Sequence, residues 1–111
     1  MSDCLFCKIA AGDIPSKQLF SDEHVVAFHD IAPEAPHHFL VIPRKHYANA
    51  AELAADSELS AHLLAVATRL AEAEIADGYR LVFNTGLDGG QTVFHAHLHV
   101  LGGRSLQWPP G

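Results

Sequence analysis

Three histidines near the end of the chain alternate with apolar residues. On a strand, His95, His97 and His99 would share one face, with successive imidazoles roughly 7 Å apart, because strand side chains alternate between faces. The residues facing the other way would be Ala96, Leu98 and Val100. A neutral imidazole, with an unperturbed pKa of ~6.5, is a nucleophile at neutral pH and leaves easily from phosphorus. A neighbouring imidazole can donate a hydrogen bond to phosphoryl oxygens or protonate a leaving group, so the pattern indicates phosphate chemistry.

A glycine-rich segment, residues 84–92, directly precedes these histidines. Glycines can turn main-chain N–H groups towards an anion, although such segments are also common hairpin connectors. The loop and the histidines together favour a phosphate site over a structural hairpin. The sequence contains no carboxylate pair and no serine motif that competes for the catalytic role.

The two cysteines, Cys4 and Cys7, form a second group of reactive residues. Their spacing places both thiols on one face of a first helical turn, where they can reach one ion, and helix N-termini favour thiolates. The spacing by itself leaves metal binding, redox chemistry and chance open. Nine histidines in 111 residues point towards chemistry or metal binding.

Length and charge limit the kind of ligand. A chain of 111 residues suits one domain with a single core. Its net charge is −6 and no run of Lys or Arg interrupts the acidic balance, whereas a protein that grips long nucleic acid normally has a basic stripe. The N-terminal residues lack the regions of a signal peptide, and no apolar run approaches the ~20 residues of a membrane span. We expect a cytoplasmic protein that binds a small ligand, and neither long nucleic acid nor a membrane.

Hydrophobic periodicity and turn residues predict the elements that position these groups. A short helix over residues 4–11 has Asp3 as its N-cap, and a capping box at Asn49 starts a short helical turn. The main helix covers residues 57–77, with an apolar stripe of Leu59, Leu63, Val66 and Leu70. Strands are predicted at residues 18–21, 25–30, 39–42, 79–84 and 92–101. This order predicts an α+β domain over residues 1–111, with a mainly antiparallel five-stranded sheet, one long and one short helix, and an extended tail at residues 102–111.

The sequence resembles the histidine triad (HIT) superfamily, whose signature alternates three histidines with apolar residues. It is most similar to the histidine triad nucleotide-binding (Hint-type) branch of purine nucleoside phosphoramidases. The segments that carry the resemblance are residues 6–9, 28–33, 38–43, 88–92, 95–101 and 101–111, of which the terminal Trp-Pro-Pro-Gly is the most branch-specific.

The resemblance implies a role for each matching residue. His97 would be the nucleophile that forms a nucleotidyl-histidine intermediate, His99 would bind the phosphate, and His38 would support the catalytic site from the adjacent strand. The implied nucleotide-binding residues are Phe6, Ile9, Phe28, His29, Asp30, Ile31, Asn84, Gly90, Gln91, Thr92, His97 and His99. Phe6, Ile9, Phe28 and Ile31 would enclose the purine, and Asp30 would accept hydrogen bonds from the ribose. Phe28 and Ile31 are equally compatible with core positions, and Asp30 with a turn ahead of Pro33.

A structural zinc site also follows from the resemblance. Relatives with the two-cysteine motif often use the first triad histidine and a histidine after the Ile-Pro strand end, which implies Cys4, Cys7, His46 and His95 as ligands. Two thiolates and two imidazoles are a normal tetrahedral set for zinc. Other members lack the cysteines, so catalysis is expected to require no cofactor.

The implied activity is hydrolysis of the P–N bond in purine nucleoside phosphoramidates of the AMP type, by a homodimer whose two sheets join. Two alternatives remain. One is a dinucleoside polyphosphate hydrolase, against which the Trp-Pro-Pro-Gly tail argues, and the other is a zinc-stabilised nucleotide-binding or interaction module with negligible turnover. The tail itself would either plug its own subunit's surface with Trp108 or cross to the partner's leaving-group pocket.

Overall fold

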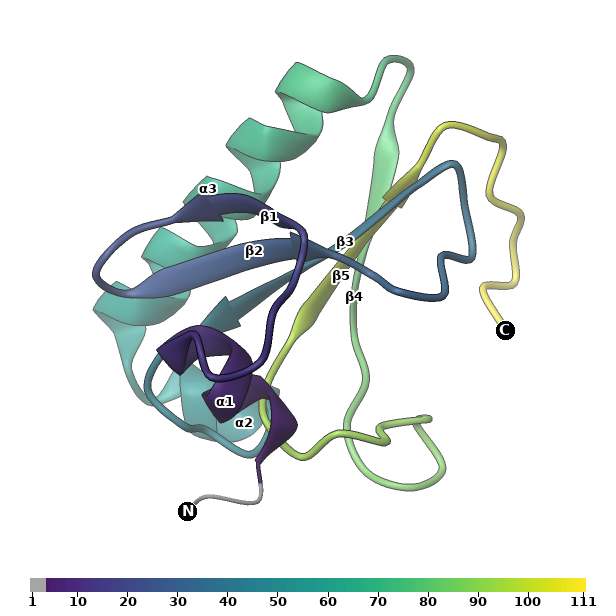
Figure 1. The fold of residues 1–111 in the computed structure, drawn as a ribbon. Coiled ribbons are helices and arrows are strands. Elements are labelled where there is room, and N and C mark those ends of the chain that lie inside the picture. The colour runs from purple at the N-terminus through teal and green to yellow at the C-terminus, as the bar shows by residue number, and fades with distance from the viewer. Residues whose placement is uncertain (1–3) are drawn as a thin grey trace.

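The computed structural model describes residues 4–111, which form a five-stranded antiparallel sheet with helices on both faces (Figure 1). The strands run in the order β1-β2-β3-β5-β4, so β5 lies between β3 and β4. The helices are α1 (Leu5–Ala11), α2 (Ala50–Ala54) and α3 (Ser57–Glu74), and the strands are β1 (Gln18–Ser21), β2 (Val25–His29), β3 (His37–Pro43), β4 (Tyr79–Phe83) and β5 (Leu98–Gly102). The predicted α+β fold with a five-stranded sheet is confirmed, with α2 as a third helix.

The sheet separates two hydrophobic cores. The core on the face of α3, here called the α3-side core, contains Val25, Ala27, Phe39, Val41, Leu53, Leu63, Val66, Ala67, Ala71, Ile75, Ala96, Leu98 and Val100. The core on the face of α1, here called the α1-side core, contains Phe6, Ile9, Ala10, Val26, Phe28, Leu40 and Ile42. Successive residues of β2 and β3 therefore alternate between the two cores, as strand geometry requires. α3 and α1 therefore cover opposite faces of the sheet.

Helices α2 and α3 begin at polar caps. The side chain of Asp56 accepts the Leu59 N–H at the start of α3, and Asn49 accepts the Glu52 N–H at the start of α2, as the sequence predicted for Asn49. α3 ends at Glu74 rather than at residue 77. Ile75 is already extended, and the left-handed backbone of Asp77 and Gly78 turns the chain into β4. Leu63 and Val66 of the predicted stripe are fully buried.

The first helix begins where the two cysteines lie. Cys4 is the N-cap of α1, and its Sγ accepts the Cys7 N–H at 3.3 Å. Asp3, which the sequence predicted as this cap, lies outside the described residues. Gly12 ends the helix with a φ of 84°, a left-handed conformation that glycine adopts without steric cost.

The last strand is shorter than the sequence predicted, because it begins at Leu98 instead of Thr92. Its pairing with β3 runs from His37↔Gly102 to Val41↔Leu98. Pro43, at the end of β3, has no N–H and cannot continue the ladder. The segment before Leu98 bonds elsewhere instead: Ala96 N–H donates to the Tyr47 carbonyl at 2.6 Å. His95 and His97 therefore precede the regular strand.

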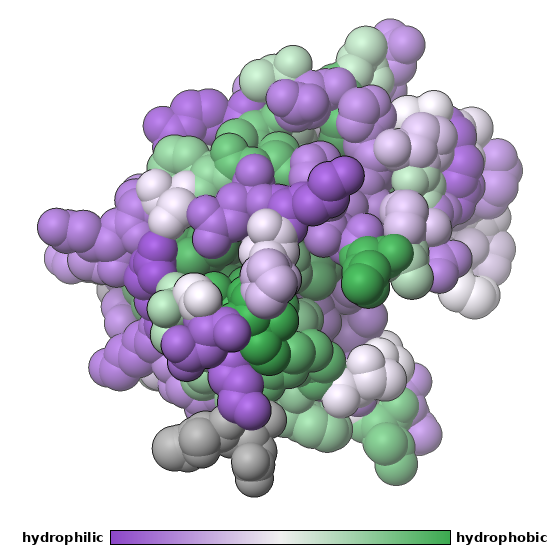
Figure 2. Space-filling view, in the orientation of Figure 1, coloured by the Kyte–Doolittle hydropathy of each residue, from purple (hydrophilic) through white to green (hydrophobic). Residues whose placement is uncertain are grey.

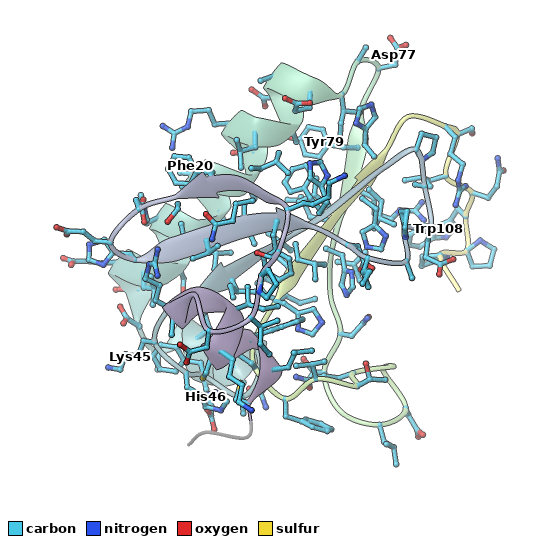
Figure 3. All side chains as sticks on the ribbon, in the orientation of Figure 1. Phe20, Lys45, His46, Asp77, Tyr79 and Trp108 are labelled. Carbon is cyan, nitrogen blue, oxygen red and sulfur yellow. The ribbon has the colours of Figure 1, made fainter. Side chains whose placement is uncertain are left out.

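The tail leaves the sheet at Gly103, where φ is 92°. It then runs beside β4, where the Arg80 guanidinium donates to the carbonyls of Leu106 and Gln107. Trp108, on this tail (Figure 3), remains 82% exposed. It therefore does not plug the surface of its own chain. No helix within residues 4–111 is long and apolar enough to cross a bilayer.

Candidate active site and metal site

The triad histidines are largely removed from solvent. His95 is completely buried, His97 is 7% exposed and His99 is half-buried. Their apolar neighbours face the opposite core, as predicted: Ala96, Leu98 and Val100 all belong to the α3-side core. The predicted ring spacing is wrong, since the ring centroids of His97 and His99 are 4.9 Å apart. The difference arises because only His99 lies within the regular strand.

The tautomer of His97 is set by a main-chain carbonyl. Nδ1 of His97 lies 2.8 Å from the carbonyl oxygen of His95, which can only accept, so Nδ1 carries the proton. The lone pair therefore lies on Nε2. Burial lowers the pKa of His97, although the hydrogen bond to His95 and the charge of Asp30 oppose this shift. The ring is consequently a neutral nucleophile at neutral pH, with its reactive nitrogen defined.

The tautomer of His99 is set by a chain of hydrogen bonds that starts at Glu34. The Glu34 N–H donates to Nδ1 of His38 at 3.0 Å, so neutral His38 carries its proton on Nε2. That nitrogen lies 2.9 Å from Nδ1 of His99 and donates to it. Nδ1 of His99 is therefore an acceptor and Nε2 carries its proton. Burial, followed by the charges of His97 and His38, lowers the pKa of His99 to about 4.

His97 and His99 thus present complementary groups from adjacent rings. One offers an Nε2 lone pair and the other an Nε2–H donor, and the planes of the two rings differ by 62°. A nucleophile beside a fixed hydrogen-bond donor is the arrangement that attack on a phosphoryl group needs, since the donor stabilises charge on the oxygens. Neutral His99, with its low pKa, is a donor rather than an acid.

The third triad histidine belongs to a different cluster. Nε2 of His95 lies 2.8 Å from the carbonyl of Pro43 and donates to it, so its lone pair is on Nδ1. That atom lies 3.3 Å from Sγ of Cys4, 3.5 Å from Sγ of Cys7 and 3.2 Å from Nδ1 of His46. Cys7 Sγ and His46 Nδ1 are 3.4 Å apart. Figure 3 shows His46 beside α1.

These separations fit a tetrahedral metal ion. Zinc–sulfur and zinc–nitrogen bonds of ~2.3 and ~2.05 Å place ligand atoms about 3.6 Å apart for sulfur–nitrogen pairs and about 3.3 Å for nitrogen pairs. Burial, followed by the hydrogen bond and charge of Cys4, raises the pKa of the Cys7 thiol to about 11, and a cation between the thiols would offset this cost. The cluster of Cys4, Cys7, His46 and His95 could therefore hold a structural metal such as zinc.

A second cluster, Asp30, His38 and His99, also brings its ligand atoms within 4.8 Å of one another. Asp30 Oδ2 lies 3.4 Å from Nε2 of His38. The hydrogen bond from Glu34 places a proton on that same nitrogen, so it cannot offer a lone pair to a metal. This cluster is better described as a hydrogen-bond chain.

The residues predicted to enclose a purine divide into two groups. Phe6, Ile9 and Phe28 belong to the α1-side core, and the ring of Phe6 packs edge-on against those of Phe28 and His97 at 5.6 and 4.9 Å. Ile31 is fully exposed and His29 is also exposed, so Ile31 is not a core residue. Hydrophobic residues gather in the middle of the face that α1 occupies (Figure 2). An apolar ligand group could pack there.

The glycine-rich loop is more internally bonded than its sequence suggested. Gly90 N–H donates to the Leu87 carbonyl and Gln91 N–H to the Gly86 carbonyl, each at 3.0 Å. The buried Gln91 side chain accepts the Gly86 N–H and donates to the carbonyls of Ala48 and Val93. The loop therefore uses these groups to hold its own shape. Thr92 is exposed and Asn84 half-buried, which leaves their side chains accessible for an anion.

Asp30 serves two purposes. Its Oδ1 accepts the Ala32 N–H at 2.8 Å, which is the turn role that the sequence left open. Its Oδ2 faces His38 at 3.4 Å. The sequence did not reveal the groups that fix the histidine tautomers, which are the Glu34 N–H and the carbonyls of Pro43 and His95. These are main-chain atoms, and no residue type identifies them.

A cavity of about 440 Å³ lies elsewhere, lined by Glu23, His24, Arg44, Lys45, Asp56, Glu58, Leu59 and His62. Beside it, Nε2 of His62 contacts Oδ2 of Asp22 at 2.6 Å. Burial opposes ionisation of Asp22, but the N–H groups of His24 and Val25 and the His62 ring hold its pKa down at about 2. No triad residue lines this cavity, so it is distinct from the site described above.

Comparison with known proteins agrees with this geometry. Residues 11–106 match the HIT domain family. An uncharacterized HIT-like protein of Synechococcus elongatus is 49% identical over 98% of this chain and 97% of its own. The crystal structure of a HIT family hydrolase from Legionella pneumophila has a TM-score of 0.94 and 54% identity, covering 98% of this chain and all of that one. The crystal structure of a hypothetical histidine triad nucleotide-binding protein from Sulfolobus tokodaii has a TM-score of 0.76 and 35% identity, covering 89% of this chain and 68% of that one.

A sheet that carries three alternating histidines at one strand end defines the class of histidine triad proteins. This chain belongs to the HIT family.

Proposed function

We propose that the protein is a nucleotidyl hydrolase that cleaves the P–N bond of purine nucleoside phosphoramidates, in the manner of the Hint-type branch. The observation that carries this proposal is the pair of opposite tautomers on adjacent rings, an Nε2 lone pair on His97 and an Nε2–H on His99. The Legionella relative is described as a hydrolase and the Sulfolobus relative as nucleotide-binding, which supports both halves of the proposal.

The reaction takes two steps. In the first, the Nε2 lone pair of His97 attacks the α-phosphorus, and the electron pair of the P–N bond leaves with the amine, which takes a proton from water. The ring becomes a positively charged nucleotidyl-histidine, which Nδ1–H stabilises through its hydrogen bond to the His95 carbonyl. In the second, water attacks phosphorus, the Nε2–P electron pair returns to the ring, and the water proton passes to solvent. His99 donates to the phosphoryl oxygens in both steps.

The rest of the site binds the nucleotide. The apolar side chains of Phe6, Ile9, Phe28 and Ile31 pack on the base, and His29 lies near it. Asp30 accepts from the ribose hydroxyls through Oδ2, since its Oδ1 is occupied by the Ala32 N–H. Asn84 and Thr92 bind the phosphate, since the Gly90 and Gln91 N–H groups are already bonded within the loop. The homodimer is part of this proposal, and the exposed Trp108 would then contact the partner.

An assay with an adenosine 5′-phosphoramidate of a fluorescent amine tests the proposal. We expect release of the amine, accumulation of AMP, and a nucleotidyl-protein adduct on His97 after acid-free quenching. A His97→Ala variant supplies the control. Preferential cleavage of diadenosine polyphosphates would favour the first alternative. Nucleotide binding without turnover of either substrate would favour the binding module.

A further inference from the structure

Helix α1 connects the two clusters described above. Its first turn carries Cys4 and Cys7, whose thiols face His46 and His95. Between the cysteines lies Phe6, only 5% exposed, which packs against the rings of His95 and His97 at 6.1 and 4.9 Å. The same few residues therefore supply metal ligands on one side and a wall of the proposed base site on the other.

A helix of seven residues does not hold its position by itself, because helices much shorter than ~12 residues are marginal in water. The C-terminal end of α1 is anchored by Arg44, which donates to the Ala10 carbonyl and also to Asp22 and Ser21. At the N-terminal end, the packing of Phe6 is joined, within residues 4–111, only by the side-chain contacts of Cys4 and Cys7 with His46 and His95. Without a metal ion these are thiol–imidazole hydrogen bonds of 3.3–3.5 Å, which are weak.

We propose that metal occupancy of the Cys4–Cys7–His46–His95 cluster sets the affinity for the nucleotide, by fixing α1 and with it Phe6 and Ile9. This inference rests on the proposed function for the identity of the ligand. Cys4 and Cys7 are positioning residues in this scheme, because they act on the base through α1. The metal takes no part in bond cleavage.

Two quantitative consequences follow. If α1 is docked only a tenth of the time without metal, the nucleotide affinity falls tenfold, because only the docked fraction binds. KM then rises while kcat at saturating substrate is unchanged, since bound nucleotide restores the docked helix. By thermodynamic reciprocity, a bound nucleoside must raise the affinity for zinc by the same factor.

The test uses the full chain with one equivalent of zinc and the same protein after removal of zinc by a chelator and dialysis. AMP affinity is measured by calorimetry, and amide hydrogen exchange is followed in α1 and β3. Zinc affinity is measured with and without adenosine, which lacks a phosphate that would itself chelate zinc. We expect tenfold weaker AMP binding, faster exchange confined to α1, restoration by added zinc, and about tenfold tighter zinc binding with saturating adenosine.

Two variants complete the design. Cys4→Ser/Cys7→Ser should match the metal-free protein and not respond to zinc. Tyr79→Phe removes the 3.3 Å hydrogen bond to Glu72 of α3, on the face of the sheet opposite α1, and should retain the full zinc response. Equal AMP affinity and equal α1 exchange in the loaded and metal-free wild-type protein would overturn the inference and leave the proposed function intact. Failure of both forms to bind AMP would instead overturn the proposed function and the inference together.

Discussion

The two clusters of candidate ligand atoms differ in whether their atoms can offer lone pairs to a metal ion. Around Cys4, Cys7, His46 and His95, the atoms that converge can all offer lone pairs to an ion. Around Asp30, His38 and His99, a proton lies between two of the converging atoms. In both clusters the ligand atoms lie within 4.8 Å of one another, and both contain two imidazoles.

The difference originates in the main chain. A carbonyl, that of Pro43, contacts His95, and so the ring must donate to it and expose Nδ1 to the cluster. An N–H, that of Glu34, contacts His38, so that ring must accept and carry its proton towards His99. Whether a group of histidines binds metal or relays hydrogen bonds is therefore decided by the backbone group behind each ring.

The largest effect is expected from loss of the nucleophile, His97, which belongs to neither cluster. His97→Ala should lower kcat by more than about 10⁴-fold, because no other side chain can form the covalent intermediate. AMP binding should largely survive, since the ring is one contact among many. The rate of amine release measures kcat, and calorimetry measures AMP affinity. Retention of near-wild-type kcat would contradict the mechanism.

The next largest effect is expected from loss of His99, the donor at the end of the hydrogen-bond chain. His99→Ala should lower kcat by roughly 10²–10³-fold, the cost of removing one donor to a developing oxyanion. The nucleotidyl-protein should still form, only more slowly. Single-turnover quench experiments distinguish this outcome from loss of the intermediate, which would assign the nucleophilic role to His99 instead.

Removal of metal should act on stability rather than chemistry. At free zinc 100-fold above its Kd, the bound ion contributes about 2.7 kcal/mol to the free energy of unfolding. For a domain of this size that corresponds to a Tm shift of roughly 10 °C. Differential scanning calorimetry with and without chelator measures the shift. Addition of zinc to Cys4→Ser/Cys7→Ser should leave its Tm unchanged, and an equal shift there would place the ion elsewhere.

The smallest expected effect is a dependence of stability on pH. Burial lowers the pKa of His99 to about 4 from an unperturbed value of 6.5, so the unfolded chain binds more protons between these values. The free energy of unfolding should therefore fall as the pH drops from 6.5 to 4. In a His99→Asn variant it should fall less steeply with pH, as measured by urea titrations at a series of pH values. Turnover should stay constant down to below pH 6.5, because burial also lowers the pKa of His97. A rate that halves near pH 7 would contradict this.

The sequence predicted most of the fold because its signals are local. Caps, turns and the stripe of Leu63 and Val66 identified the helices, and the histidine motif identified the strand that carries the site. The sequence could not predict that β5 starts at Leu98, because this depends on Pro43 ending a strand 55 residues earlier. Nor could it predict the tautomers, which depend on main-chain atoms brought close only by the fold.

The alternation of β2 between the two cores has a practical consequence for mutational scanning. Val25 and Ala27 face the α3-side core, which holds the chain together, whereas Val26 and Phe28 face the core shared with α1 and the triad. In a saturation library scored separately for cellular abundance and for turnover, neighbouring positions should therefore sort into different classes. Substitutions at odd positions should lower both scores, and mild substitutions at even positions should lower turnover before abundance. The two-residue period of the strand would then be visible directly in the ratio of the scores.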